Sequence, residues 1–160
     1  YKVTTIFNCA PAFRNLDPEF RSCTDLLVVN ESEAEALVDF SVRTIEDARR
    51  ALKSLLEQDG YSIGIIITLG ENGCLFGERM ANNSIRHFPA REIKAVDSIG
   101  AGDAFVGALA HYMSHSKNLN SIELDKAISL AVEYASLSVE RKGAQASYYF
   151  INELEEKFRI

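Results

Sequence analysis

Apolar and polar residues follow one another along the chain in two distinct patterns. Short, continuously apolar runs, such as residues 26–29, are typical of strands that are covered on both faces. Apolar residues three and four positions apart, as at Ala48, Leu52 and Leu55, are typical of amphipathic helices. The two patterns predict strands at 2–8, 25–29, 63–69, 74–76, 84–88 and 93–96. They predict helices that start near 17, 30 and 44, and helices that span about 102–114, 121–139 and 152–158.

The order of these elements predicts the fold class. Strands that alternate with helices, several of them continuously apolar, favour an α/β layer with a mainly parallel sheet. Ligands of such sheets bind beyond the C-terminal ends of the strands. Asn30, Gly70 and the loop 97–102 each follow a predicted strand, so we expect them to meet at one edge. Strands 74–76 and 84–88 are expected to form a hairpin around residues 80–83.

Composition and charge exclude several classes of protein. The 160 residues fit one ordinary domain, and 47% hydrophobic with 25% charged residues is a globular composition. Acidic residues outnumber basic ones 23 to 17, which argues against a broad basic surface for nucleic acid or an anionic membrane. No apolar run approaches the ~20 residues of a membrane-spanning helix. Three scattered cysteines favour reduced thiols and a cytoplasmic protein, with the nucleus left open as a further compartment.

The clearest candidate for chemistry is the segment 97–103, which reads Asp-Ser-Ile-Gly-Ala-Gly-Asp. Three small residues, Gly100, Ala101 and Gly102, let backbone N–H groups approach a ligand closely. They stand at the predicted start of a helix, where unpaired N–H groups and the helix dipole favour an anion. The segment therefore suits a phosphate, or the charge that develops during phosphoryl transfer. Asp103 stands in the first turn, where an ionised carboxylate can accept a proton from a substrate hydroxyl.

Other glycine-rich motifs fit this segment less well. A Walker A loop requires Gly-Lys-Ser/Thr, and the segment contains no lysine. A dinucleotide-binding fingerprint requires a third glycine where Phe105 stands. Taken alone, Gly-Ala-Gly-Asp is also compatible with an ordinary helix start, in which Gly100 supplies the turn and Asp103 faces the helix dipole.

Several motifs in the same order resemble those of the ribokinase-like (PfkB) carbohydrate kinases. Residues 97–103 resemble the Asp-Thr-x-Gly-Ala-Gly-Asp signature, with Ser98 in place of Thr. Residues 30–33 resemble the Asn-x-x-Glu motif, and residues 68–73 resemble the Thr-x-Gly-x-x-Gly nucleotide loop. Residues 141–147 and 8–12 resemble Arg-Lys-Gly-Ala-Gln-x-Ser and Asn-Pro-Ala-Pro-Ala, the latter with Cys9 for the first Pro. The resemblance covers essentially all 160 residues and implies the C-terminal portion of a ribokinase-like three-layer α/β fold.

The same resemblance implies roles for individual residues. Asp103 would deprotonate a primary hydroxyl of the sugar, and Gly100, Ala101 and Gly102 would form the anion hole. ATP would be contacted by Asn30, by Gly102 and by the loop formed by Thr68, Leu69, Gly70, Glu71, Asn72 and Gly73. Glu33 would help to place hydrated Mg²⁺. Taken alone, residues 30–33 would be a helix N-terminus with an acidic first turn, and residues 68–73 would be a hairpin turn.

The resemblance also implies a potassium site beside the anion hole. Its members would be Asp97, Ile99, Ser138, Arg141, Gly143 and Ser147, several of them through backbone carbonyls. Oxygen ligands of this kind suit hard cations. Taken alone, Arg141 would be a solvated charge at a helix C-terminus. The three histidines, His87, His111 and His115, show no metal-ligand spacing, so we expect them to be structural or exposed.

Val132 departs from the family pattern. It stands where relatives commonly carry a polar Asn or His near the adenine. An apolar residue can still pack on the base, so an adenine contact is expected while the nucleotide preference is left open.

Members of this family run to about twice the present length. Their first strands, a Gly-Gly sugar pocket and a small β-sheet lid have no counterpart in residues 1–160, so we expect this chain to be the C-terminal, nucleotide-binding and catalytic half, inactive alone. The complete protein is expected to phosphorylate ribose to ribose 5-phosphate with ATP, Mg²⁺ and K⁺, and to dimerise through its lid. Its expected partners are the sugar and the nucleotide. The alternatives are a non-catalytic nucleotide-binding or interaction fragment, and a kinase of the same family for another sugar.

Overall fold

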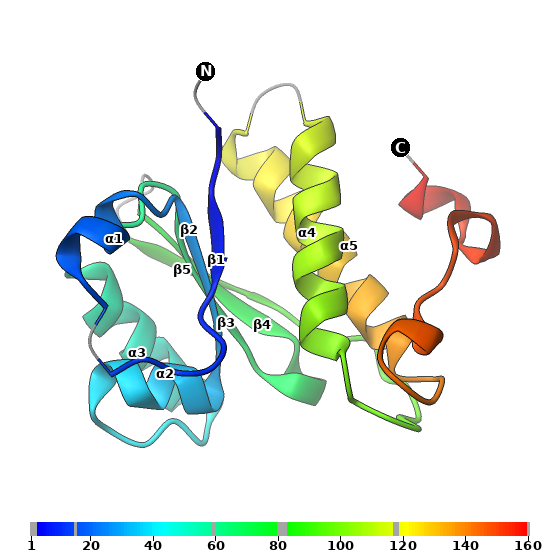
Figure 1. Ribbon diagram of the computed structural model, residues 1–160, viewed down its shortest axis with the longest axis horizontal. Helices are drawn as coiled ribbons and strands as arrows, with labels where there is room; N and C mark the ends of the chain where they lie inside the picture. The colour runs from blue at the N-terminus through cyan, green and yellow to red at the C-terminus, as the bar shows by residue number, and fades with distance from the viewer. Residues whose placement is uncertain (1–2, 15, 59, 80–82, 117–118, 160) are drawn as a thin grey trace. The chain divides into compact units, whose positions relative to one another are not determined.

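The computed structural model divides into two units, residues 1–88 and residues 89–160 (Figure 1). It describes residues 3–14, 16–58, 60–79, 83–116 and 119–159. The first unit is built on a β-sheet and the second on a pair of α-helices. Among the helices in these described ranges, none is both long and apolar enough to cross a membrane.

A mixed sheet forms the centre of the first unit. Its described strands stand in the order β1 (Ile6–Asn8), β2 (Leu26–Asn30), β3 (Gly64–Thr68), β4 (Cys74–Glu78) and β5 (Ser84–Phe88). β1, β2 and β3 are parallel neighbours, while β4 is antiparallel to both β3 and β5. All strands of this sheet except β4 therefore run in one direction, which confirms the mainly parallel α/β sheet. The register of β4 and β5 confirms the hairpin, although residues 80–82 of its connection lie outside the described residues.

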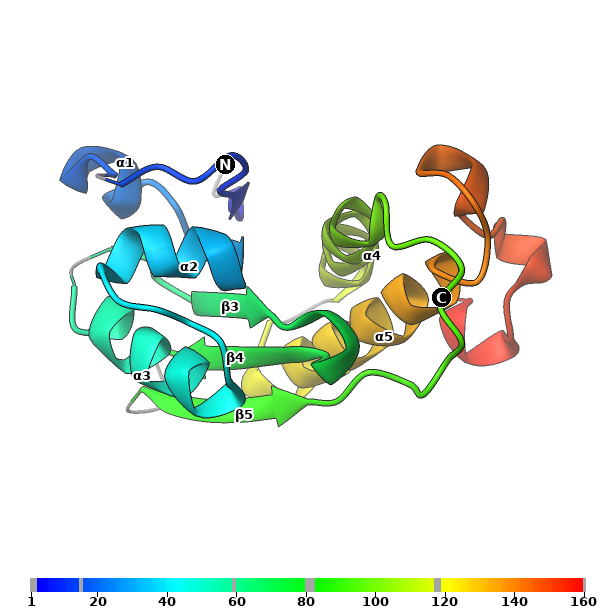
Figure 2. The same ribbon diagram turned by 90° about the horizontal axis from the view of Figure 1, so that it is seen from below.

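Two helices cover one face of this sheet. Helices α2 (Glu31–Val38) and α3 (Ile45–Leu56) pack side by side against it, and the short helix α1 (Pro18–Ser22) precedes β2 (Figure 2). The predicted apolar stripe of α3 is buried against the residues of β2 and β3 that face the same side, among them Leu27 and Ile65. Full burial of a leucine or isoleucine side chain stabilises the fold by about 1.5–3 kcal/mol. This packing holds β2 and β3 in place, so that their C-terminal ends, at Asn30 and Thr68, lie side by side at one edge of the sheet.

Two antiparallel helices form the framework of the second unit. Helices α4 (Ala101–His115) and α5 (Ser121–Ser138) lie side by side and run in opposite directions (Figure 1). Phe105 and Leu109 of α4, like Leu124 and Ile128 of α5, are buried. Short 3₁₀ turns follow at η2 (Gln145–Ser147), η3 (Ile151–Glu153) and η4 (Glu156–Phe158).

Two predicted strands differ from the structure. The described part of the first strand begins at Ile6, and residues 3–5 are not in a strand, because the N–H and hydroxyl groups of Thr5 bond to the carboxylate of Asp25; residue 2, where the predicted strand begins, lies outside the described residues. Residues 93–96 form no strand. The N–H group of Val96 instead donates to the carbonyl of Val139, at 2.8 Å, in the turn after α5.

The prediction of a last helix at 152–158 was also wrong. The chain there forms the two turns η3 and η4, separated by Leu154 in an extended conformation. Leu154 and Phe158 are buried, and the Tyr112 hydroxyl donates to the carbonyl of Phe158. We attribute the difference to these tertiary contacts, because a single short segment gains little from helix formation alone.

Candidate active site

Asn30 and Glu33 cap helix α2 reciprocally. The Asn30 side-chain oxygen accepts a hydrogen bond from the Glu33 N–H at 2.9 Å, and the Glu33 carboxylate accepts one from the Asn30 N–H at 2.8 Å. This is a capping box, which satisfies two N–H groups at a helix start. The helix N-terminus expected from residues 30–33 is thus present, and it holds the carboxylate of Glu33 with only 8% of the residue exposed. A contact of Glu33 with hydrated Mg²⁺ stays a prediction.

The loop 68–73 is a closed turn beside this capping box. Thr68 pairs with Asn30 at the ends of β3 and β2, so both motifs lie at the same edge of the sheet. The Leu69 N–H donates to the carbonyl of Gly73 at 2.7 Å, and Leu69 itself is buried. The 3₁₀ turn η1 (Gly70–Asn72) is exposed, so its backbone is accessible to a ligand while the Leu69 side chain is not.

His87 supports this turn from β5. A ring nitrogen of His87, Nε2, lies 2.7 Å from the carbonyl oxygen of Asn72. His87 thus has the structural role expected for it, and it contacts the candidate nucleotide loop through Asn72.

The second unit contains the candidate anion site, at the start of α4. Gly100 adopts a left-handed conformation with φ of 82° and has no side chain with which to cap the helix. The described helices α1, α2, α3 and α5 all begin with a side-chain cap, supplied by Asp17, Asn30, Thr44 and Asn120. The first turn of α4, at the positive end of the helix dipole, therefore has no side-chain cap on its N–H groups, although the N–H of Ala101 donates to the carbonyl of Ser98 at 3.2 Å.

Asp103 is the third residue of α4 and is exposed. The first helical hydrogen bond, from the Ala104 N–H to the Gly100 carbonyl at 2.8 Å, fixes the turn that carries it. A Cβ atom placed on Gly102 would meet no heavy atom within 4 Å, so the space in front of this turn is open. An acceptor for a proton and donors for an anion thus occupy one turn.

Hydrogen bonds connect the loop before α4 to the segment after α5. The two carboxylate oxygens of Asp97 accept from the N–H groups of Ile99, at 3.0 Å, and Gly143, at 2.9 Å. These two bonds lower the pKa of Asp97, and the bond from Gly143 has the larger effect. The N–H groups of Val96 and Asp97 donate to the carbonyl of Val139. Three residues of the expected potassium site, Asp97, Ile99 and Gly143, are therefore in direct contact.

Arg141 can contribute to such a site only through its backbone. Its guanidinium bonds to Glu153 at 2.9 Å and lies over the ring of Tyr149, 3.6 Å from the centroid. The hydroxyls of Ser138 and Ser147 donate to the carbonyls of Ala135 and Ala144. The atoms that could act as metal ligands are carboxylate, carbonyl and hydroxyl oxygens, so the residues present fit a hard cation such as K⁺.

The side chains give no metal cluster for Mg²⁺ in the part of the chain that the structure describes. No group of three or more His, Cys, Asp or Glu side chains that could hold a metal ion gathers there. This fits Mg²⁺, which in phosphoryl-transfer sites binds mainly to phosphates, water and one or two carboxylates. Val132 is buried in α5, with 5% exposed, and its expected contact with adenine stays a prediction.

A cavity of about 280 Å³ lies next to Asp103 in the second unit. Its wall includes Tyr112, Tyr134, Tyr148 and Tyr149. Each of their hydroxyls donates to a protein acceptor, so they contribute mainly aromatic carbon to the wall. None of the four was predicted to be a site residue. The adjacent pair 148–149 directly follows the Arg-Lys-Gly-Ala-Gln-x-Ser stretch, and this position was an available signal.

Comparison with known proteins assigns the family. Residues 2–149 match the sequence pattern of the pfkB family carbohydrate kinases. The chain belongs to the pfkB family. The resemblance inferred from the motifs is thereby confirmed.

Individual members of the pfkB family agree with this assignment. The chain is 40% identical to mouse (Mus musculus) ribokinase over 152 residues, 95% of this chain and 45% of that protein. It is 38% identical to Salmonella typhi deoxyribokinase over 154 residues, 96% of this chain and 47% of that protein. The crystal structure of Thermotoga maritima ribokinase superposes with a TM-score of 0.76 at 34% identity, covering 96% of this chain and 48% of that one. The chain thus has the ribokinase-like fold and spans about half the length of the curated relatives it matches.

Each unit brings together part of the predicted pfkB site. In the first unit, the Asn-x-x-Glu motif and the loop 68–73 share one edge of the sheet. In the second unit, the signature 97–103 is joined to residues 139–148 by hydrogen bonds. The first group holds the residues predicted to contact the nucleotide, and the second combines the candidate anion site with the candidate base.

Proposed function

We propose that the complete protein transfers the terminal phosphate of ATP to the primary hydroxyl of ribose. The observation that carries this proposal is the start of α4, where N–H groups without a side-chain cap adjoin the exposed carboxylate of Asp103. Membership in the pfkB family supports it, since that family consists of carbohydrate kinases.

In this reaction Asp103 accepts the proton of the sugar hydroxyl as the hydroxyl oxygen attacks the γ-phosphorus of ATP. The bond between that phosphorus and the β–γ bridging oxygen breaks, and ADP leaves. The N–H groups of the first turn of α4 stabilise the negative charge on the transferred phosphoryl group. The exposed loop 70–72 and Asn30 contact the nucleotide. Mg²⁺ bound to the phosphates would neutralise charge, with Glu33 orienting its water shell, and K⁺ beside Asp97 would order the loop that precedes the anion site.

A second candidate substrate is 2-deoxyribose. The identities to mouse ribokinase and to Salmonella deoxyribokinase, 40% and 38%, are too similar to separate the two sugars. The two sugars share the primary hydroxyl on which Asp103 would act, so the chemistry proposed for Asp103 applies to both. Phosphorylation of each sugar by the complete protein, measured in parallel through ADP release, distinguishes them.

The proposed base is tested by Asp103→Asn in the complete protein. The amide is nearly isosteric but cannot accept the proton, and a positioned acid–base group contributes ~10²–10⁴-fold. We expect kcat to fall by that factor while nucleotide affinity changes little. The matched control is Glu123→Gln, which removes an acidic side chain from the same third helical position, in α5.

The control variant should retain nearly the activity of the unmodified protein. Turnover of Asp103→Asn close to that of the unmodified protein would contradict the assignment of the base. Nucleotide binding without phosphorylation of any sugar by the unmodified protein would favour the non-catalytic alternative.

A further inference from the structure

A tyrosine hydroxyl bonds directly to the loop that begins α4. Tyr148 Oη donates to the carbonyl oxygen of Gly100 at 3.0 Å, across 48 positions of sequence. The same carbonyl accepts the first helical hydrogen bond of α4, from the Ala104 N–H at 2.8 Å. Both lone-pair directions of this oxygen are therefore in use, one by the helix and one by Tyr148.

The packing around Gly100 leaves no room for a side chain at this position. A Cβ atom on Gly100 would lie 2.9 Å from both Tyr148 Oη and Ala144 Cα. Tyr148 follows a turn that is itself fixed, because the buried Ser147 bonds through both its N–H and its hydroxyl to the carbonyl of Ala144. The hydroxyl thus reaches Gly100 from a rigid support.

The peptide plane connects this bond to the anion site. The carbonyl of Gly100 and the N–H of Ala101 belong to one planar peptide group, so fixing the oxygen also fixes the direction of that N–H. The Ala101 N–H itself donates to the carbonyl of Ser98 at 3.2 Å, so the same peptide plane sets the turn that continues into Gly102 and Asp103. The N–H groups later in this turn stabilise a transition state less well when the orientation of the turn varies.

We propose that Tyr148 is a positioning residue, whose hydroxyl holds the Gly100–Ala101 peptide in the orientation that the anion hole requires. This inference rests on the proposed function, because it assigns the first turn of α4 to the transferred phosphoryl group. Burial, followed by the negative charge of nearby Asp103, raises the pKa of Tyr148, so its hydroxyl stays protonated and able to donate at neutral pH.

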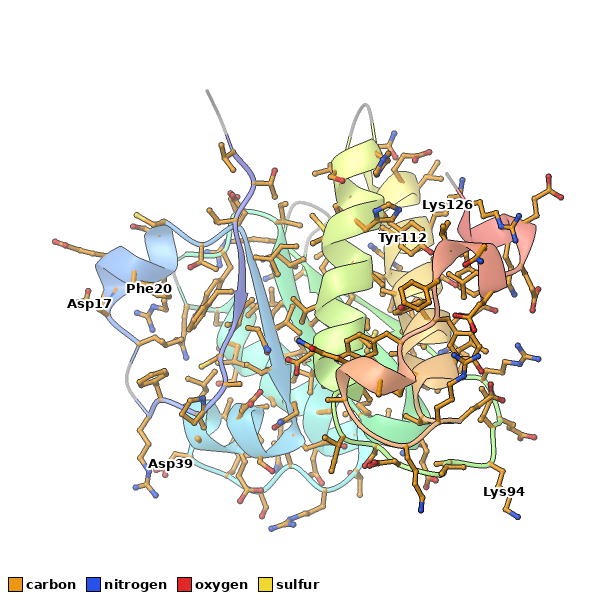
Figure 3. The ribbon with its side chains drawn as sticks, turned by 45° about the vertical axis from the view of Figure 1, so that its right-hand side comes forward. Asp17, Phe20, Asp39, Lys94, Tyr112 and Lys126 are labelled. Carbon is orange, nitrogen blue, oxygen red and sulfur yellow. The ribbon has the colours of Figure 1, made fainter. Side chains whose placement is uncertain are left out.

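Tyr112 provides a matched control within the same cavity. It projects from α4 toward the C-terminal turns, where its hydroxyl donates to the carbonyl of Phe158 at 3.3 Å (Figure 3). Tyr112→Phe and Tyr148→Phe each remove one tyrosine hydroxyl that bonds to a backbone carbonyl. Tyr112 is the more buried of the two, so its variant reports the cost in stability alone.

The experiment compares both variants in the complete protein. We expect Tyr148→Phe to lower kcat about three- to tenfold, the range that corresponds to one neutral hydrogen bond, with the KM for sugar and nucleotide unchanged. Amide hydrogen exchange at Ala101 and Ala104, whose N–H groups donate to the carbonyls of Ser98 and Gly100, should accelerate by a similar factor, because the Gly100 carbonyl is then held only by the helix. Tyr112→Phe should change neither kcat nor exchange at Ala101 and Ala104.

The two readouts separate this inference from the proposed function. If the unmodified protein phosphorylates neither sugar, the proposed function fails, and the hydrogen exchange of Tyr148→Phe still decides whether Tyr148 holds the turn. Unchanged exchange at Ala101 and Ala104 in Tyr148→Phe overturns the inference. An equal loss of kcat in Tyr112→Phe also overturns it, because the effect would then reflect stability rather than position.

Discussion

Replacing Gly100 by alanine should destabilise the second unit strongly. Gly100 has φ of 82°, a region in which an L-residue costs about 1–2 kcal/mol. The new Cβ would also lie 2.9 Å from Ala144 Cα, which is backbone and cannot rotate away. Overpacking of this kind costs about 1–3 kcal/mol. The expected loss in the free energy of unfolding is therefore about 2–5 kcal/mol, out of a total of about 5–15 for a domain.

Gly102→Ala is the matched substitution, two residues along the same helix start. Its Cβ would meet no heavy atom within 4 Å, and its backbone is helical. Alanine is favoured over glycine in a helix by about 0.5–1 kcal/mol, so stability should be unchanged or slightly raised. The methyl group would nevertheless enter the open space in front of the first turn, so phosphoryl transfer should fall.

Urea unfolding of this chain, followed by circular dichroism, measures the loss of stability, and a kinase assay of the complete protein measures the loss of activity. A loss of about 2–5 kcal/mol corresponds to a fall in Tm of about 4–20 °C for a protein of this size. Gly100→Ala should lose both stability and activity, whereas Gly102→Ala should lose activity alone. Equal unfolding midpoints for Gly100→Ala and the unmodified protein would refute the argument from conformation and packing.

Two further predictions concern Asp97. Because backbone N–H groups lower its pKa in the folded protein, its contribution to stability is present above its ordinary pKa of 3.8 and is lost as the pH falls through the lowered value. Asp97→Asn should therefore unfold at a lower urea concentration than the unmodified protein at pH 7, and the difference should shrink below about pH 3.8; a difference independent of pH would contradict this. If Asp97 also holds K⁺, the complete enzyme should be faster in K⁺ than in Na⁺, and Asp97→Ala should reduce the difference; equal rates in the two salts would count against the site.

The elements that the sequence predicted correctly depend on local signals. Continuous apolar runs marked β2 and β3, because both faces of these strands are buried. Thr44 and the acidic residues after it marked the start of α3, where Thr44 and Asp47 form a capping box. Such signals extend over three to five residues and need no knowledge of distant contacts.

The elements that were wrong depend on distant partners. Residues 93–96 have the composition of a strand, but the Val96 N–H bonds to the carbonyl of Val139 in the turn after α5. The bond of Tyr148 to Gly100 was invisible for the same reason, since nothing local to either residue indicates it. The roles drawn from the family resemblance are contacts with the sugar, the nucleotide, Mg²⁺ and K⁺. These contacts stay predictions.

The start of α4 shows how a helix start can be held without a side-chain cap. A side-chain cap stabilises a helix start by about 1 kcal/mol, but it occupies an N–H group that an anion would need. In α2 the cap occupies one such group, because Asn30 accepts a hydrogen bond from the Glu33 N–H. At α4 the Ala101 N–H donates to the carbonyl of Ser98, and further support comes from long-range hydrogen bonds, from Gly143 to Asp97 and from Tyr148 to Gly100, which leave the N–H groups of the first turn without a side-chain cap. This is why we assign the proposed phosphoryl group to the start of α4 and not to a capped helix start.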